Sequence, residues 1–135
     1  MTSEDKEKLL FKDLCARLPY GIKASYYGVE EECETWDEIE CITLNGYVDI
    51  GQYSLTIESI KPYLFPLSSM TNEQKKELKY LCDWENDRWR GLVVIQEGEF
   101  CMNTEIIDWL NKNHFDYNRL IEKGLAIDAT GLNIY

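Results

Sequence analysis

The chain has a single histidine, His114, and none of its five cysteines is paired in a C-x-x-C spacing. Zinc sites usually combine several Cys and His ligands at short spacings, so we expect no metal and no cofactor. The glycine-rich loops G-x-G-x-x-G and G-x-x-x-x-G-K-[ST] are also missing, which removes the usual motifs for nucleotide binding. A G-x-S-x-G nucleophile elbow and a D-x-[DN]-x-[DN]-G calcium loop are missing too. No catalytic residue is therefore predicted.

Long apolar runs are absent as well. No stretch approaches the roughly 20 apolar residues of a spanning helix, and the first ten residues, MTSEDKEKLL, do not resemble a signal peptide. An odd number of cysteines without a signal peptide suits a reducing compartment. We therefore expect a cytoplasmic protein whose cysteines are free thiols, most of them buried in the core.

Basic residues are scarce: 14 Lys and Arg stand against 25 Asp and Glu, for a formal net charge of −11. Direct binding of nucleic acid needs clustered Lys and Arg, and anionic membranes attract the same residues. We expect neither kind of partner. The 135 residues fit one domain, 1–135, that is long enough to bury its own core.

Hydrophobic periodicity predicts an α+β fold. We expect an antiparallel sheet of about four to six short strands packed with three to four helices. Leu10, Leu14 and Leu18 recur every four residues, which predicts a first helix with Ser3 as its N-cap. Pro19 and Gly21 should end this helix. Period-two alternation and the Asn45-Gly46 turn signal then predict a meander whose strands are 22–27, 36–44, 47–50 and 53–57.

The second half of the chain returns to helical spacing. Residues 61–70 should be irregular because they contain Pro62 and Pro66. A Thr71-x-x-Gln74 capping box predicts a helix over 72–90, and a β-branched run predicts a strand at 92–96. A further helix should begin at 103 or 104, and a last short one at Asp116, before an extended tail over 125–135. The predicted core is Leu10, Leu14, Leu55, Ile57, Leu78, Leu81, Val93, Ile95, Ile106 and Leu110.

The distribution of charge is the most informative feature. Residues 24–60 contain nine acidic residues and no Lys or Arg, and seven of the acids lie between 30 and 40. These carboxylates could simply protect a sheet edge from aggregation. Alternatively, they form a docking surface for a basic protein, with interleaved aromatic residues such as Trp36 as anchors. The predicted partner-binding residues are Glu30, Glu31, Glu32, Glu34, Trp36, Asp37, Glu38 and Glu40.

One polar cluster offers an alternative site. His114 follows a predicted helix, and Asp116, Tyr117 and Arg119 come directly after it. A histidine at the end of a helix is usually structural. A small enzyme or a protein that sequesters a small molecule would nevertheless need converging polar groups of this kind, so a pocket near His114 stays open as the second hypothesis.

Three stretches of the chain resemble a known group of proteins: LPYGIK (18–23), IKPYLFPLSSMT (60–71) and IDWLNKNHFDYNRLIEKGLAID (107–128). They are similar to small proteins without an assigned function from Bacteroidales gut bacteria, their phages and their mobile elements. The resemblance implies a cytoplasmic, phage or mobile-element setting and no particular chemistry. In that setting, an acidic binding protein could inhibit a host defence nuclease by presenting carboxylates where the enzyme expects phosphates.

Overall fold

The computed structural model describes residues 2–26, 35–81 and 104–135, and within them the chain forms three α-helices and one six-stranded sheet. The predicted α+β fold is confirmed. The α-helices are α1 (Ser3–Arg17), α2 (Asn72–Leu81) and α4 (Thr104–Lys112). The strands are β1 (Lys23–Tyr26), β2 (Thr35–Ile42), β3 (Tyr47–Ile50), β4 (Tyr53–Thr56), β5 (Ile60–Leu64) and β6 (Ile127–Asp128). Short 3-10 turns are η1 (Leu18–Tyr20), η2 (Ile57–Ser59) and η3 (Leu67–Ser69). The predicted helix end near 90 and strand at 92–96 lie outside the described residues.

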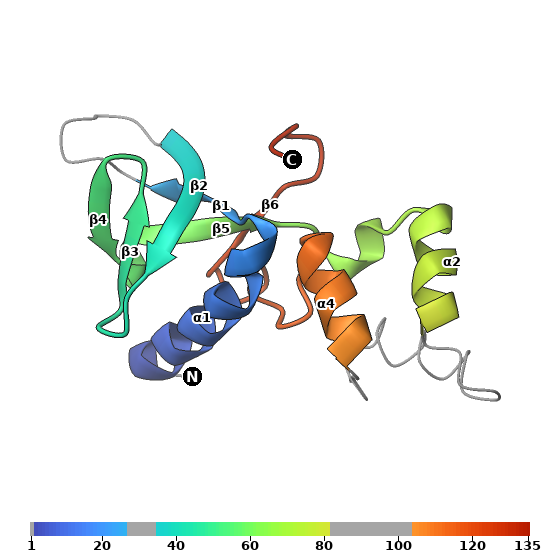
Figure 1. The fold of residues 1–135 in the computed structure, drawn as a ribbon, viewed down its shortest axis with the longest axis horizontal. Coiled ribbons are helices and arrows are strands. Elements are labelled where there is room, and N and C mark those ends of the chain that lie inside the picture. The colour runs from blue at the N-terminus through green and yellow to red at the C-terminus, as the bar shows by residue number, and fades with distance from the viewer. Residues whose placement is uncertain (1, 27–34, 82–103) are drawn as a thin grey trace.

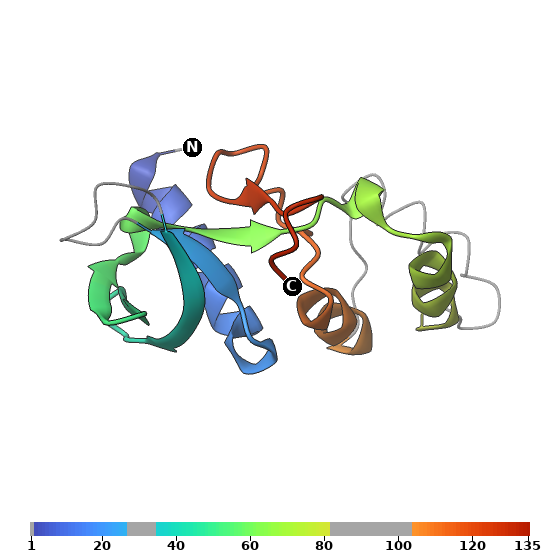
Figure 2. The ribbon, with the colours of Figure 1, turned by 90° about the horizontal axis from the view of Figure 1, so that it is seen from above.

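The sheet has the strand order β4-β3-β2-β1-β5-β6. Every pair is antiparallel except β5 with β6, which is parallel. Strands β1 to β4 lie at one end of the molecule, α2 lies at the other, and β6 and α4 lie between them (Figure 1). Figure 2 shows β5 as the strand that reaches from the sheet towards the helices.

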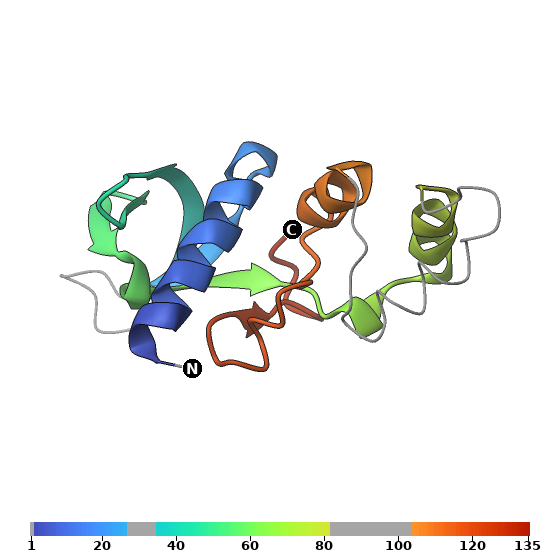
Figure 3. The same ribbon diagram turned by 90° about the horizontal axis from the view of Figure 1, so that it is seen from below.

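Helix α1 covers one face of the sheet (Figure 3). Its N-cap is Thr2 and not the predicted Ser3, because Thr2 and Asp5 form a reciprocal capping box. Leu10 and Leu14 are buried against the sheet, in a main core that also contains Ile22, Ile39, Val48, Ile50, Ile57, Ile60, Leu64 and Leu120. The helix ends as predicted, because Pro19 lies in the 3-10 turn η1 and Gly21 is left-handed, with φ 77°.

The hairpin between β2 and β3 has a tight turn at the predicted place. Gly46 adopts φ 83° and donates its N–H to the Thr43 carbonyl at 3.0 Å. Leu44 belongs to this turn rather than to the strand, and it is 97% exposed. Before this turn, the register of β2 with β3 shifts between Ile39 and Cys41, and this shift is a β-bulge. Because of the bulge, Ile39 and Ile42 both face the core while Glu40 and Cys41 are both exposed.

The prediction that residues 61–70 are irregular is wrong for their first part. Strand β5 runs through Pro62 and lies between β1 and β6. A proline cannot donate to a ladder, but β6 pairs only with Tyr63 and Leu64, so Pro62 has a neighbouring strand on one side only. Ile60, Tyr63 and Leu64 are buried because β5 is a central strand.

The predicted last helix at 116–122 is replaced by turns, although its predicted cap is present. The Asp116 carboxylate accepts the N–H groups of Leu120 and Ile121, both at 2.9 Å. Arg119 interrupts the helical path because its φ is 57°, a left-handed value. The tail beyond it is ordered rather than loose, since it contains β6 and then packs on Tyr63 through Ala129 and Ile134.

The core prediction is confirmed at most of the described positions. Leu10, Leu14, Ile57, Leu78, Ile106 and Leu110 are buried. Leu55 on the edge strand β4 and Leu81 at the end of α2 are only half-buried, and Val93 and Ile95 lie outside the described residues. A second cluster joins α2 to α4 through Met70, Leu78, Ile106, Leu110, Phe115 and Tyr117.

Cysteine burial differs from the expectation at both described positions. Cys15 on α1 and Cys41 at the bulge are free thiols, and both are exposed. The other three, Cys33, Cys82 and Cys101, lie outside the described residues. In the part of the chain that the structure describes, no helix is both long and apolar enough to cross a membrane.

Candidate functional site

The two faces of the sheet differ in what covers them. Side chains alternate along a strand, so Ile60 and Leu64 face the α1 core while Lys61 and Tyr63 point to the opposite side, which we call the outer face. The C-terminal tail covers the Tyr63 end of the outer face. The strand register then places Trp36 on this face, in line with Ser25 and Lys61.

Trp36 is exposed on this face, with 46% of its surface accessible. Lys23 lies opposite Glu38 in the neighbouring strand. Its ammonium nitrogen lies 5.3 Å from the centre of the Trp36 ring and 5.6 Å from the centre of the Tyr135 ring. One lysine therefore lies against two aromatic rings that are 99 positions apart in the sequence.

Tyr135 is fixed in place by its hydroxyl group and its ring. The hydroxyl accepts the backbone N–H of Lys23 at 3.0 Å and donates to the carbonyl of Tyr63 at 2.9 Å. His114 stacks on the ring with centroids 3.6 Å apart and an interplanar angle of 10°. Burial raises the pKa of Tyr135 to about 12, so the hydroxyl keeps its proton at neutral pH. The sequence did not indicate a role for this residue.

The predicted acidic residues are distributed over both faces. Glu38 shares the outer face with Trp36, whereas Asp37 lies on the α1 side, near Gly51 and the hydroxyl of Tyr26. Glu40 is exposed at the bulge. The remaining four, Glu30, Glu31, Glu32 and Glu34, lie outside the described residues.

The aromatic residues that alternate with these acids also differ in position. Tyr26 is buried in the core, where its ring lies 5.9 Å from that of Tyr53. Tyr47 is 46% exposed but lies at the other end of β2 from Trp36, beside the hairpin turn. Of the described aromatic residues on β1 to β4, Trp36 and Tyr47 are the exposed ones, and Trp36 shares its face with Glu38.

Lys23 and Lys61 flank the base-free stretch 24–60 in the sequence, and both lie beside residues of this stretch in the sheet. Lys23 lies directly opposite Glu38, and Lys61 lies one strand further along, opposite Ser25. Their positive charges partly offset the acids of the outer face. The negative charge around the described strands is therefore smaller than the sequence count for residues 24–60 indicates.

The residues of the second hypothesis lie together at the end of α4. His114 has φ 62°, and its buried Nδ1 has no hydrogen-bond partner among the described residues. Burial, with the nearby charges of Arg17 and Lys23, lowers the pKa of His114 to about 4. The ring is therefore neutral at physiological pH.

The neighbours of His114 have structural contacts. Asp116 is bonded to two backbone N–H groups, and burial raises the pKa of its carboxyl group. Tyr117 is buried and donates its hydroxyl to Asn111 Oδ1 at 2.7 Å. Arg119 is exposed in a turn. These contacts explain the positions of Asp116 and Tyr117 without requiring a ligand.

A buried ion pair at the centre of this region was missed at the sequence level. Arg17 is fully buried, and its Nε donates to Asp13 Oδ1 at 2.6 Å. Its Nη2 donates to the Phe115 carbonyl at 2.7 Å, and its guanidinium lies 4.8 Å from the centre of the Tyr117 ring. The available signal was the i,i+4 spacing of the two charges close to the apolar stripe of α1.

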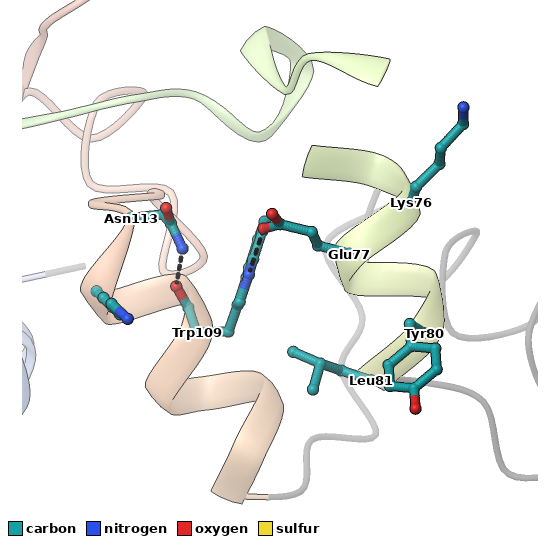
Figure 4. A pocket seen from close by; sticks show the side chains of 7 residues that line it. Lys76, Glu77, Tyr80, Leu81, Trp109 and Asn113 are labelled. Carbon is teal, nitrogen blue, oxygen red and sulfur yellow. Dashed lines mark hydrogen bonds between the residues drawn. The ribbon is translucent and has the colours of Figure 1, made fainter. Parts of the chain in front are cut away.

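A groove of about 700 Å³ lies between α2 and α4. Figure 4 shows Trp109 between the two helices, with its indole N–H donated to Glu77 Oε2 at 3.2 Å. The groove is lined by Lys76, Glu77, Tyr80, Leu81, Trp109, Lys112 and Asn113. It is thus an aromatic surface with two lysines, and Lys112 and Asn113 directly precede His114.

No group of three or more His, Cys, Asp or Glu side chains within the described ranges could hold a metal ion. A scan against models of protein families found no match for the chain, and searches of the curated proteins and of the solved structures found no similar protein.

Proposed function

We propose that this protein is a non-catalytic interaction protein that docks on a basic protein partner through residues 30–40. The observation that supports the proposal most directly is the exposure of Trp36, 46% of whose surface is accessible on a regular strand. Tryptophan is among the residues that most often dominate binding energy at interfaces. Exposed Glu38 shares the outer face with Trp36, and exposed Asp37 and Glu40 lie on the same strand.

Electrostatic steering is the second support. The chain carries a net charge of −11, and nine of its acidic residues lie in a stretch without Lys or Arg. A charge distribution of this kind speeds encounter with a positively charged protein and makes the encounter sensitive to salt. The resemblance to proteins of phages and mobile elements suggests a partner class, a host nuclease whose basic groove normally holds phosphates.

The experiment begins with a pull-down from the native host at low and high salt, followed by charge reversal. Changing Glu30, Glu31, Glu32 and Glu34 together to Lys should weaken the captured partner by about tenfold or more, at ~0.5–1 kcal/mol per contact. The matched control reverses four exposed acids elsewhere, Glu73, Glu105, Asp108 and Glu122. If the Glu-to-Lys variant keeps its full affinity for the partner at low salt, the docking proposal is wrong. The acids would then serve to protect a sheet edge from aggregation.

Trp36→Ala tests the proposed anchor separately. If Trp36 is a central contact, affinity should fall by about 30-fold, the equivalent of ~2 kcal/mol. The side chain is half-exposed, so the free energy of unfolding should change little. Tyr47→Ala is the matched control, because Tyr47 is equally exposed at the far end of β2. Equal effects of the two substitutions would argue against a site centred on Trp36.

A second candidate, the capture of a small molecule, is favoured by the groove between α2 and α4. Its volume of about 700 Å³ lies in the range of ligand pockets, and Lys76 and Lys112 suit an anionic group. Native mass spectrometry of the protein purified from its host should then detect a bound anion. Lys76→Ala with Lys112→Ala should release it, and a ligand that stays bound in this double variant would place its site elsewhere.

A further inference from the structure

We propose that Trp36 and Tyr135 form a cage for a primary ammonium group, which Lys23 occupies in this structure and which a lysine of the partner enters by displacing it. This inference rests on the proposed function, because it names the chemical group that the docking surface recognises. It assigns specificity to Tyr135, a residue that lies far from Trp36 in the sequence but contacts the same lysine on the outer face.

The two rings provide the attraction. Aromatic faces attract cations within about 6 Å of the ring centre, and the Lys23 nitrogen lies 5.3 Å from the centre of Trp36 and 5.6 Å from that of Tyr135. Glu38 adds a negative charge on the same face, opposite Lys23. The surroundings therefore suit a cation generally, not only the one that occupies them.

A hydrogen-bond acceptor makes the cage selective for an ammonium group that carries N–H. The backbone carbonyl of Ile134 accepts from Lys23 Nζ at 2.8 Å. A quaternary ammonium group has no proton to donate, so it would leave this carbonyl unpaired. We therefore infer recognition of unmodified lysine rather than of trimethyl-lysine.

The cage is organised before any partner arrives. Tyr135 is held by the hydrogen bonds of its hydroxyl to Lys23 and Tyr63 and by its stacking on His114. Trp36 belongs to a strand paired with β1. Rigid aromatic groups of this kind lose little conformational entropy on binding.

The exchange of one lysine for another is feasible. Trp36 is 46% exposed and Tyr135 is 40% exposed, so both rings can be reached from solvent. The incoming ammonium regains the contacts that Lys23 gives up, and the flexible stem of Lys23 lets its own ammonium return to water. Occupation by Lys23 lowers the apparent affinity, because only the fraction of molecules with an open cage can bind.

The experiment removes the internal occupant. Lys23→Ala keeps the backbone N–H that binds Tyr135, and butylammonium serves as the probe. Binding is followed by the NMR signal of the Trp36 indole N–H, assigned with Trp36→Phe. The variant should bind butylammonium about tenfold more tightly than the wild type. Tetramethylammonium should bind more weakly than butylammonium, and neutral 1-butanol should leave the signal unshifted.

Lys61→Ala is the matched control, because it removes the same charge from the same face. Equal tightening in both lysine variants would mean a general charge effect and would overturn the cage, as would an equal shift with 1-butanol or no shift with butylammonium. If Lys23→Ala does not fold by circular dichroism, Lys23→Met, which keeps most of the stem, replaces it. The titration contains no protein partner, so its outcome is independent of the charge-reversal experiment on residues 30–34.

Discussion

Arg17 is the residue whose surroundings constrain the fold most strongly. It is a fully buried cation that joins α1 to the segment after α4 through Asp13 and the Phe115 carbonyl. Asn118 donates to the second oxygen of Asp13 at 2.7 Å, so both carboxylate oxygens are occupied. Such a pair tolerates the loss of both members better than the loss of one, because a single deletion leaves an uncompensated buried charge.

Asp13→Ala should therefore lower the free energy of unfolding by about 3–5 kcal/mol in a denaturant titration. Lys12→Ala, at the exposed neighbouring position on α1, should change it by no more than about 0.5 kcal/mol. The double variant Asp13→Leu with Arg17→Met should recover much of the loss. If the single and double variants are equally unstable, the charge of Arg17 is not the cause.

A second single residue, His114, makes the free energy of unfolding depend on pH. Its pKa in the folded protein is about 4, below the ordinary 6.5, because of burial and the charges of Arg17 and Lys23. Between these values the unfolded chain binds a proton that the folded chain does not, so stability rises with pH. The stability that the neutral His114 contributes is fully present above about pH 6.5, and it is lost as the pH falls towards 4.

We expect the wild type to lose about 1 kcal/mol through His114 between pH 7 and pH 5, with allowance for the partial exposure of the ring. His114→Asn suits the left-handed backbone and does not titrate, so it should remove this loss in urea titrations at the two pH values. The pKa values of Asp116 and Glu7 are raised, so these groups make stability fall as the pH rises, in the wild type and in the variant alike. An unchanged pH dependence in the variant would contradict the assignment.

At the scale of elements, the packing of α2 on α4 buries two leucines to different extents, although the sequence predicts both as core residues. Leu78 is completely buried in the second cluster, whereas Leu81 is half-buried and lines the groove. Leu78→Ala should cost about 2–5 kcal/mol of unfolding free energy, as truncations in a packed core do. Leu81→Ala should cost clearly less. Equal costs in the same denaturant titration would show that Leu81 is packed as tightly as Leu78.

At the scale of the whole molecule, the redox state of the cysteines can be counted. Thiol titration of the denatured protein should find all five cysteines reduced, because we expect a reducing compartment. Brief alkylation of the native protein should modify Cys15 and Cys41, which are both exposed. The loss of two thiols without a change in oligomeric state would reveal an internal disulfide and contradict the expectation of a reducing compartment.

Local signals in the sequence determined much of the fold. The leucine spacing of the first helix, the Asn45-Gly46 turn and the capping box of Thr71 with Gln74 all act over a few residues, and each is present in the structure. The acidic segment and the exposed Trp36 could be selected as a candidate surface for a similar reason, because the order of residues in the chain is enough to count charges. Whether that surface binds a partner stays a prediction.

Tertiary structure decided what depends on segments that are distant in sequence. Pro62 disfavours a strand on local grounds. Strand β5 nevertheless forms because β1 pairs with it along one edge and β6 along the other. The burial of Arg17 depends on Phe115 and Tyr117, and the contact between Lys23 and Tyr135 joins positions 112 residues apart. Strand pairing and ion burial draw their free energy from such distant contacts, which no local pattern encodes.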